Sequence, residues 1–132
     1  MNKFTKGILS LGITLSILAG ATGVTAFAAQ KTDKKEGEIN HYYTVGSSSI
    51  EDLYASAYTS YGNNGSVYLS STLDYIDLNL LKTYSETKTR GHYRSASLDY
   101  RLHSHCRTIR ITSQHDVYGF DQHWNAKTTV VR

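Results

Sequence analysis

The chain has no proline and a single cysteine, and both features narrow the classes of protein it can belong to. A cell-wall sorting motif that depends on proline is excluded. An internal disulfide is excluded as well, because Cys106 has no second cysteine to pair with. Stability must therefore come from an apolar core and backbone pairing. Cys106 is in phase with nearby apolar residues and is predicted to be a small buried side chain.

Motifs of the common enzyme classes are also missing. The sequence contains no Gly-x-Ser-x-Gly nucleophile elbow, no phosphate-binding loop and no His-Glu-x-x-His zinc motif. A nucleophile pair of Cys106 and His115 has no supporting sequence context, and the cysteine is expected to be buried. We therefore expect a protein that is not an enzyme.

A long apolar run occurs only near the N-terminus. Lys3 and Lys6 precede the apolar run 8–19, and the tripeptide 26–28, Ala-Phe-Ala, fits the small-x-small pattern of signal cleavage. Residues 1–28 are therefore predicted to be a signal peptide, and the mature protein to be secreted. The alternative is a transmembrane helix, for which the run is too short. No later stretch is apolar enough to span a bilayer.

Charge is distributed unevenly along the mature chain. Residues 29–40 are charged and nearly free of apolar side chains, so we predict a disordered segment ahead of a single β domain over 41–132. Seven basic residues stand against two acidic ones in 82–110. A basic face there would suit an anionic wall polymer, lipid headgroups or nucleic acid. Strand alternation alone also explains these arginines, and no nucleic-acid partner is expected.

Alternating polarity predicts that the domain is all-β. In the central stretch 93–102, Ala96, Leu98, Tyr100 and Leu102 occupy every second position and polar residues fill the gaps. The stretch 107–112 repeats the pattern, but its apolar residues occupy odd-numbered positions instead of even-numbered ones. This phase change predicts a turn or bulge at 103–106.

Further strands are expected at 41–45, 53–61, 67–75, 82–90 and 124–131. A helix over 48–61 is the alternative for the second, but the Asn-Gly pair that follows favours a hairpin between two strands. A parity change at 75–76 predicts a bulge or a new strand, and Gly91 predicts a turn. The expected fold is a small antiparallel β-sandwich or barrel of six to seven strands.

The eleven tyrosines suggest a binding surface. Tyr54, Tyr58, Tyr75 and Tyr100 lie on faces predicted to be buried. Exposed aromatic rings can stack on sugars or bind another protein, whereas β-propensity alone is the simpler explanation. The candidate binding residues are Arg94, Arg101, Arg110, Tyr61, Tyr68, Tyr118 and Trp124. Tyr42 and Tyr43 are also expected at the surface.

The histidines suggest a metal site as an alternative. His103 and His105 would lie on one side of a strand, which is a spacing that serves Zn²⁺ or Cu²⁺, and His115 is the third candidate ligand. No established ligand motif surrounds them, and solvated histidines are common on such a face. We therefore expect no required cofactor.

The layout of the chain resembles a known kind of protein. The run 109–119, Ile-Arg-Ile-Thr-Ser-Gln-His-Asp-Val-Tyr-Gly, is followed by Trp124. With the signal and the short Ser/Thr/Tyr strands, it resembles uncharacterised small secreted β proteins of Gram-positive bacteria. The plan is also similar to Sec-exported lactococcin-like bacteriocins, which are small β-sandwich peptides that act at the cell envelope.

Three functions follow as hypotheses. The first is a secreted, extracellular, non-enzymatic β domain that binds a cell-envelope component at the bacterial surface or an extracellular protein. The second, implied by the resemblance, is an antibacterial protein. The third is a metal-binding protein. An exposed edge strand rich in Tyr and Thr also predicts self-association.

Overall fold

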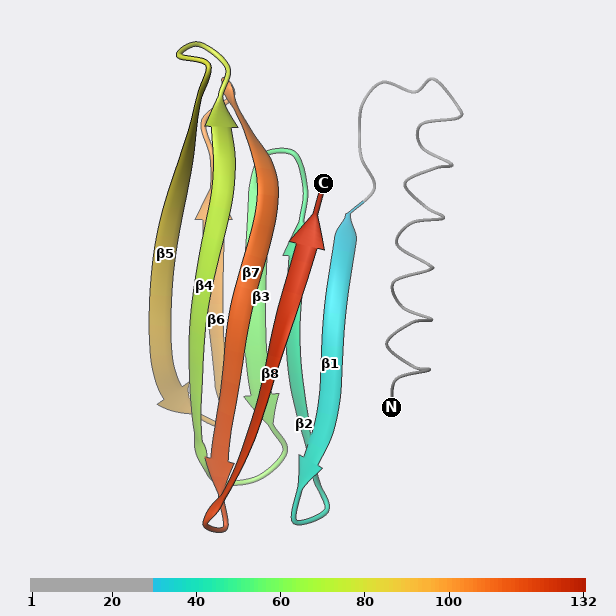
Figure 1. Cartoon of the computed structure of the whole chain (residues 1–132). Helices are drawn as coiled ribbons and strands as arrows, with labels where there is room; N and C mark the ends of the chain where they lie inside the picture. The colour runs from blue at the N-terminus through green and yellow to red at the C-terminus, as the bar shows by residue number, and fades with distance from the viewer. Residues whose placement is uncertain (1–29) are drawn as a thin grey trace.

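The computed structural model describes residues 30–132, which form eight β-strands (Figure 1). The predicted signal peptide, residues 1–28, lies outside this range. Within the described residues no helix has the length and apolarity to cross a membrane. The all-β prediction is confirmed, with eight strands in place of six to seven. The strands are β1 (Lys31–Ile39), β2 (Tyr42–Ile50), β3 (Tyr54–Tyr61), β4 (Ser66–Asp77), β5 (Lys82–Tyr93), β6 (Ser95–Arg101), β7 (Cys106–Gly119) and β8 (Gln122–Val131).

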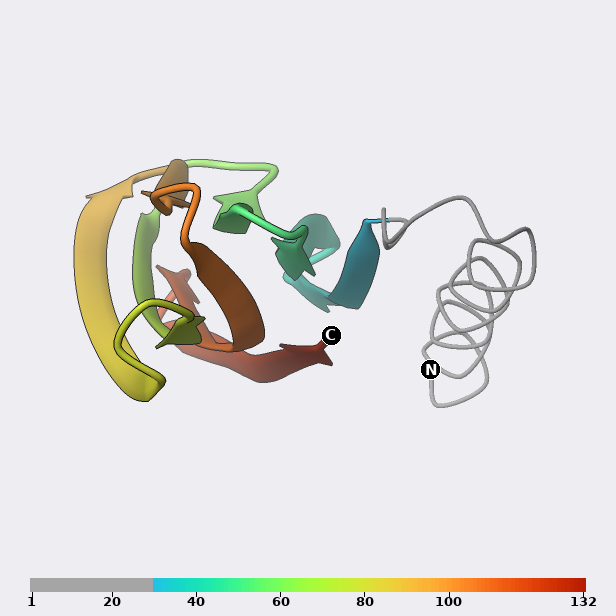
Figure 2. The same cartoon turned by 90° about the horizontal axis from the view of Figure 1, so that it is seen from above.

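The strands form two antiparallel sheets of four. The first sheet has the order β1-β2-β3-β6, and the second has the order β5-β4-β7-β8 (Figure 2). The connections β3–β4, β5–β6 and β6–β7 each pass from one sheet to the other. The sandwich, rather than the barrel, is thus the observed form of the predicted fold.

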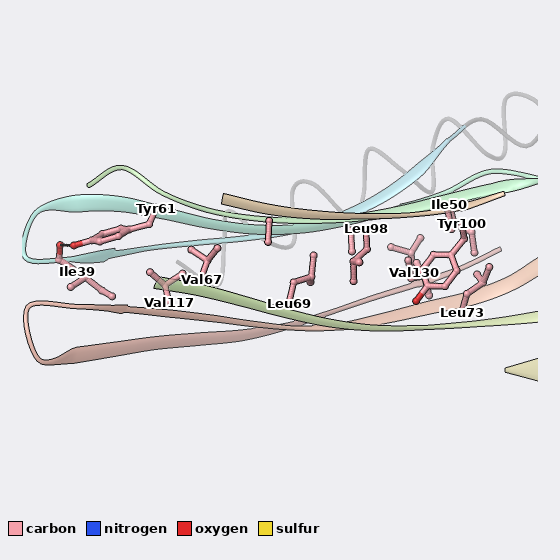
Figure 3. Close-up of a cluster of buried hydrophobic side chains, with 14 residues drawn as sticks. Ile39, Ile50, Tyr61, Val67, Leu69, Leu73, Leu98, Tyr100, Val117 and Val130 are labelled. Carbon is pink, nitrogen blue, oxygen red and sulfur yellow. Dashed lines mark hydrogen bonds between the residues drawn. The ribbon is translucent and has the colours of Figure 1, made fainter. Parts of the chain in front are cut away.

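Apolar side chains from both sheets fill the space between them (Figure 3). On β6, Ala96, Leu98 and Tyr100 are buried and the residues between them are exposed, as the alternation predicted. Cys106 is buried, as predicted. The turn expected at 103–106 is present as a connection over 102–105.

The buried face of β3 is the opposite of the one predicted. Ala55, Ala57 and Thr59 point into the core, whereas Tyr54 and Tyr58 lie on the outer face. At one of these inner positions, Thr59 contacts a buried histidine from the facing sheet, as described below. A tyrosine can stay at the surface at little cost, because its hydroxyl remains hydrated there.

The Asn-Gly segment does not close a hairpin. Residues 62–65 carry the chain from β3 in the first sheet to β4 in the second, so the predicted β3–β4 pairing is wrong. Gly65 is needed for close packing rather than for a hairpin turn. A Cβ at this position would lie 2.4 Å from the carbonyl oxygen of Tyr118 and 2.9 Å from the ring of Tyr61.

Residues 31–39 form β1, so the predicted disorder of 29–40 is wrong over this range. β1 pairs with β2 along its whole length. Its inward-facing carboxylate, Asp33, accepts the backbone N–H of Thr129 on β8 at 3.0 Å and faces the ammonium of Lys35 at 3.3 Å. The charged composition of this strand is therefore compatible with order, because its one buried charge is paired.

The irregularity near residue 75 lies in β7. The register of β4 against β7 shifts between Asp74 and Tyr75, and the extra residue is Ile109 of β7. The bulge predicted at 75–76 is therefore not in β4, which pairs with β5 over its whole length without a shift. The strand ends at Asp77, whose carboxylate accepts the N–H groups of Asn79 at 2.8 Å and Leu80 at 3.0 Å. Residues 78–81 therefore form an exposed turn and do not continue the strand.

The turn predicted at Gly91 is displaced. Gly91 lies inside β5, opposite Tyr68 of β4. The chain instead changes sheet at Arg94, which has a positive φ of 69°. The backbone of Arg94 holds this crossing in place, because its N–H donates to Gly65 and its carbonyl accepts from Tyr61.

Candidate functional site

His115, predicted to be a metal ligand, lies at the centre of the sandwich. Its side chain is fully buried, with Nδ1 at 2.7 Å from the hydroxyl of Thr59 and Nε2 at 2.8 Å from that of Thr128. Burial lowers the pKa of the imidazole from 6.5 to about 4, so the ring is neutral at neutral pH. Both ring nitrogens already have partners. His115 is a core residue, separate from His103 and His105.

The contacts of His115 continue as a row of buried hydroxyls. Thr128 lies 2.6 Å from Ser48, which donates to Ser113 at 2.7 Å, and Ser113 donates to Ser71 at 3.0 Å. A hydroxyl has one hydrogen, so Ser48, which donates to Ser113, must accept from Thr128. Thr128 must then accept from His115. The row therefore requires the Nε2–H tautomer of His115, with Thr59 donating to Nδ1.

The predicted basic residues do not form a single face. Arg94 lies between β5 and β6, and Arg101 lies over the ring of Tyr54 on the first sheet, 5.2 Å from its centroid. Arg110 lies on the second sheet and forms two hydrogen bonds with Asp74, at 3.0 and 2.7 Å. A sandwich turns the outer faces of its sheets in opposite directions, so Arg101 and Arg110 cannot contact one flat ligand together.

The predicted aromatic binding residues do not lie together on one surface either. Tyr61 is buried, with 3% of its surface exposed, so its prediction as a surface residue is wrong. Trp124 is half-buried against the core, and its indole lies against Gly37 of the facing sheet. Tyr68 is exposed on β4, and Tyr118 is exposed at the end of β7. Of these four, only Tyr118 belongs to the cluster described next.

Two hairpin turns lie at one end of the sandwich (Figure 1). The β1–β2 turn has Asn40 and His41 at φ values of 49° and 70°, and the β7–β8 turn has Phe120 and Asp121 at 51° and 56°. Two successive positive φ values are typical of a type I′ turn, which favours Asn and Gly. Phe120 is unusual there, because a bulky side chain in the left-handed region is strained.

Aromatic rings from both turns meet at this end. The rings of Tyr42 and Phe120 are stacked, with centroids 6.0 Å apart and an interplanar angle of 5°, although Tyr42 and Phe120 remain 42% and 52% exposed. The rings of Tyr42 and the buried Tyr61 in turn form an edge-to-face pair, with centroids 6.4 Å apart. We define the aromatic end as Tyr42, Tyr118, Phe120 and His123.

The second half of the aromatic end combines a ring stack with polar groups. The rings of Tyr118 and His123 are parallel, with centroids 4.3 Å apart. Nε2 of His123 lies 2.8 Å from a carboxylate oxygen of Asp116, which orients the imidazole. Residues 118–123 line an open hollow of ≈ 520 Å³ beside these rings. A hollow of this volume is large enough to hold a small ligand.

A second cluster lies at the opposite end of β7. Asp77, His105 and Cys106 each present a donor atom, and the three atoms lie within 4.8 Å of one another. Nε2 of His105 is 3.5 Å from Oδ2 of Asp77, and the ring of His103 stacks on that of His105. Burial raises the pKa of the Cys106 thiol, and the nearby Asp77 carboxylate raises it further.

Two of these residues had no sequence signal that marked them as site residues. Asp77 is far from His105 in sequence, and only the pairing of β4 with β7 places it opposite Cys106. Phe120 was missed because its turn lacks the Asn-Gly signature that marks a type I′ hairpin. Comparison of the chain with protein-family models, curated proteins and solved structures gives no match.

Proposed function

We propose that the chain is a secreted, non-enzymatic binding module whose aromatic end binds the sugar rings of a cell-envelope polysaccharide. The export signal expected at residues 1–28 supports a role outside the cell. Flat aromatic faces and adjacent carboxylate, imidazole and amide groups provide the two kinds of contact that a sugar offers, apolar C–H faces and hydroxyls.

The observation that carries this proposal is the conformation of Phe120. Its backbone is left-handed and its ring is half exposed, so the residue contributes little burial in return for its strain. The ring nevertheless stacks on Tyr42, which contacts the buried Tyr61. A strained residue that presents a stacked, exposed ring is suited to contact a ligand.

The polar groups around the hollow support the same ligand class. Asp116 fixes the ring of His123, and Asp121 and Gln122 line the hollow beside it. These side chains supply both donors and acceptors within one open surface. A ligand rich in hydroxyls can satisfy them, whereas a purely apolar ligand would leave them unpaired.

Binding to purified Gram-positive cell-wall sacculi tests the proposal. Co-sedimentation of the chain with sacculi gives an apparent affinity for the wild type and for the Phe120→Asn variant. We expect the variant to bind at least tenfold more weakly, because it loses the exposed ring. Its fold should be retained or stabilised by about 1 kcal/mol, because Asn tolerates a positive φ.

Tyr58→Ala is the matched control, because Tyr58 is an exposed tyrosine on the outer face of β3, away from the hairpin turns. It should bind like the wild type. Equal binding by wild type and Phe120→Asn would contradict the proposal, as would a wild type that stays in the supernatant. Growth inhibition of neighbouring strains without binding to sacculi would favour the antibacterial alternative.

A metal-binding function is the second candidate, and the Asp77–His105–Cys106 cluster favours it. Imidazole, thiolate and carboxylate are the usual ligands of Zn²⁺, and three protein ligands leave one position for water. One oxygen of Asp77 is occupied by the turn amides of Asn79 and Leu80, which leaves the other to face His105. Binding would have to release the proton of Cys106.

Titration with Co²⁺ tests the second candidate. A thiolate ligand gives a sulfur-to-cobalt charge-transfer band in the near ultraviolet, and Cys106→Ser should abolish it. His123→Ala is the control, because His123 also pairs with an aspartate but has no cysteine nearby. A wild type with no such band would rule out a thiolate-containing site.

A further inference from the structure

The two sheets have four edges, and those formed by β1 and β8 close against each other. Asp33 of β1 accepts the N–H of Thr129 on β8, and the ammonium of Lys31 donates to the carbonyl of Val131 at 3.1 Å. An inward-facing charge at a strand edge prevents further strands from adding. No further strand is therefore expected to pair on the β1–β8 side of the sandwich.

The edge formed by β5 is open. β5 pairs with β4 on one side and, within residues 30–132, with no strand on the other (Figure 2). Its twelve residues span about 40 Å, and every residue except Lys88 is exposed. The register against β4 runs without a shift, so the edge is regular. A long, regular, unpaired edge is a template for another strand.

The sequence of β5 is complementary to itself. Along β5, the backbone N–H and C=O groups of successive residues point alternately toward β4 and away from it. In an antiparallel pair of two β5 strands, a residue whose groups point away from β4 must lie opposite another such residue. The two-fold axis therefore passes beside a residue, which lies opposite its own copy, and not between two residues. Placing the axis at Thr87 sets Glu86 of each copy opposite Lys88 of the other. The same register sets Tyr84 opposite Arg90, a pair that forms cation–π contacts.

The neighbouring registers are unfavourable. An axis at Glu86 or at Lys88 places that charge opposite its own copy. An axis at Ser85 places Lys82 opposite Lys88, and an axis at Thr89 places Lys88 opposite Arg90. Glu86 and Lys88 already approach to 3.9 Å within one chain. The Thr87 register therefore produces a ring of four alternating charges, which no other central register does.

We propose that two copies of the chain form a closed dimer by antiparallel pairing of their β5 strands in the Thr87 register. The two second sheets would then join into one continuous sheet across the axis. Pairing through β5 stops at two copies, because each copy has one β5 edge and the two-fold pairing uses both. The dimer does not depend on the proposed sugar ligand.

Sedimentation over a range of concentrations tests the dimer. The full chain and the segment 30–132, which contains both sheets, are compared so that association through the apolar residues 8–19 is recognised. We expect the wild-type segment to dimerise reversibly. Glu86→Lys should weaken the dimer by about tenfold or more, because it replaces two opposite-charge pairs with two like-charge pairs. Lys88→Glu should weaken it as well, and it also removes the hydrogen bond from the Lys88 ammonium to the carbonyl of Asp99 at 2.8 Å.

The decisive measurement is a mixture of the two variants. In a heterodimer of Glu86→Lys with Lys88→Glu, every lysine faces a glutamate, so the affinity should return to the wild-type level. Glu38→Lys, the same charge change at an exposed site on β1, is the control and should dimerise normally. Circular dichroism confirms that each variant is folded. A monomeric wild-type segment, or a mixture no tighter than its components, would overturn the proposal.

Discussion

At the scale of single residues, this core is unusual in having polar groups at its centre. His115 and the hydroxyls of Thr59, Thr128, Ser48, Ser113 and Ser71 are buried between the sheets and bond to one another. A buried polar group is costly only where it lacks a partner. Stability at this scale therefore depends on whether each hydrogen-bonding group is satisfied.

The folded state should lose stability in acid because of His115. Its pKa is about 4 in the folded state, below the usual 6.5, because the core excludes the charged form. Between pH 6.5 and 4 the unfolded chain binds a proton that the folded chain does not. This difference removes about 3 kcal/mol of unfolding free energy over that interval. Above pH 6.5 the residue has no effect.

Urea unfolding at pH 7, 5.5 and 4 measures this loss. A His115→Gln variant keeps one donor and one acceptor but cannot be protonated in this range, so its stability should depend less on pH. The difference between the two proteins isolates His115 from the exposed histidines. Identical pH dependence would show that the core does not hold the imidazole neutral.

Thr44 is the exception to the pairing of core hydroxyls. It is fully buried, and its Oγ1 has no hydrogen-bond partner among residues 30–132. Thr44→Val removes the unpaired hydroxyl and keeps the shape, so it should stabilise the fold by about 1 kcal/mol.

Thr59→Val should instead destabilise the fold by about 1–3 kcal/mol, because it leaves Nδ1 of His115 unpaired. Urea midpoints that moved in the same direction would contradict this assignment.

At the scale of strands, the alternation of polar and apolar residues predicted where strands lie more reliably than which face of each strand is buried. β6 was predicted correctly because all its apolar residues lie on one face. On β3 the tyrosines alternate with small residues, and size suggested the wrong face. The inward-facing Thr59 contacts the ring of His115 instead. A bulge in β4 was predicted as one of two alternatives, whereas the extra residue is Ile109 of the neighbouring β7. Disorder was wrongly predicted for residues 31–39 because the pairing of Asp33 is a tertiary contact.

Gly46 of β2 shows how closely the strands approach the central histidine. A Cβ at this position would lie 2.4 Å from Cγ of His115. Gly46→Ala should therefore displace the ring and reduce stability by about 2 kcal/mol. Gly91→Ala is the matched control, because its nearest contact would be an ordinary 3.7 Å to Tyr68. Thermal unfolding of both variants distinguishes a steric effect from a general cost of replacing glycine in a strand.

At the scale of the whole molecule, the two sites are products of the topology. The aromatic end combines two hairpins from different sheets, and the Asp77–His105–Cys106 cluster combines the end of β4 with the start of β7. Of the residues in these sites, the sequence indicated Tyr42, Tyr118 and His105. It could not indicate which of them meet, because strand order depends on the three-dimensional pairing. The exposed edge at 82–90 was predicted and is confirmed.

The hydrogen bonds between the edge strands β1 and β8 should be essential to the stability of the sandwich. Asp33→Ala leaves the N–H of Thr129 without its acceptor, and we expect a loss of about 2 kcal/mol. The two freed edges should also promote association into species larger than those of the wild type. Sedimentation velocity and urea unfolding measure the two effects. Glu38→Ala, at an exposed position of the same strand, should change neither.

The row of hydrogen bonds through His115 also limits how the sheets can move. Three of its bonds join one sheet to the other, from Thr59 to His115, from Thr128 to Ser48 and from Ser48 to Ser113. Apolar surfaces tolerate sliding, because side chains that separate from one neighbour soon pack against the next. Hydrogen bonds are directional, so those between the sheets are formed only when the two sheets have one position relative to each other. The row fixes the alignment of the two sheets, and with it the spacing of the two hairpin tips that carry the stacked rings.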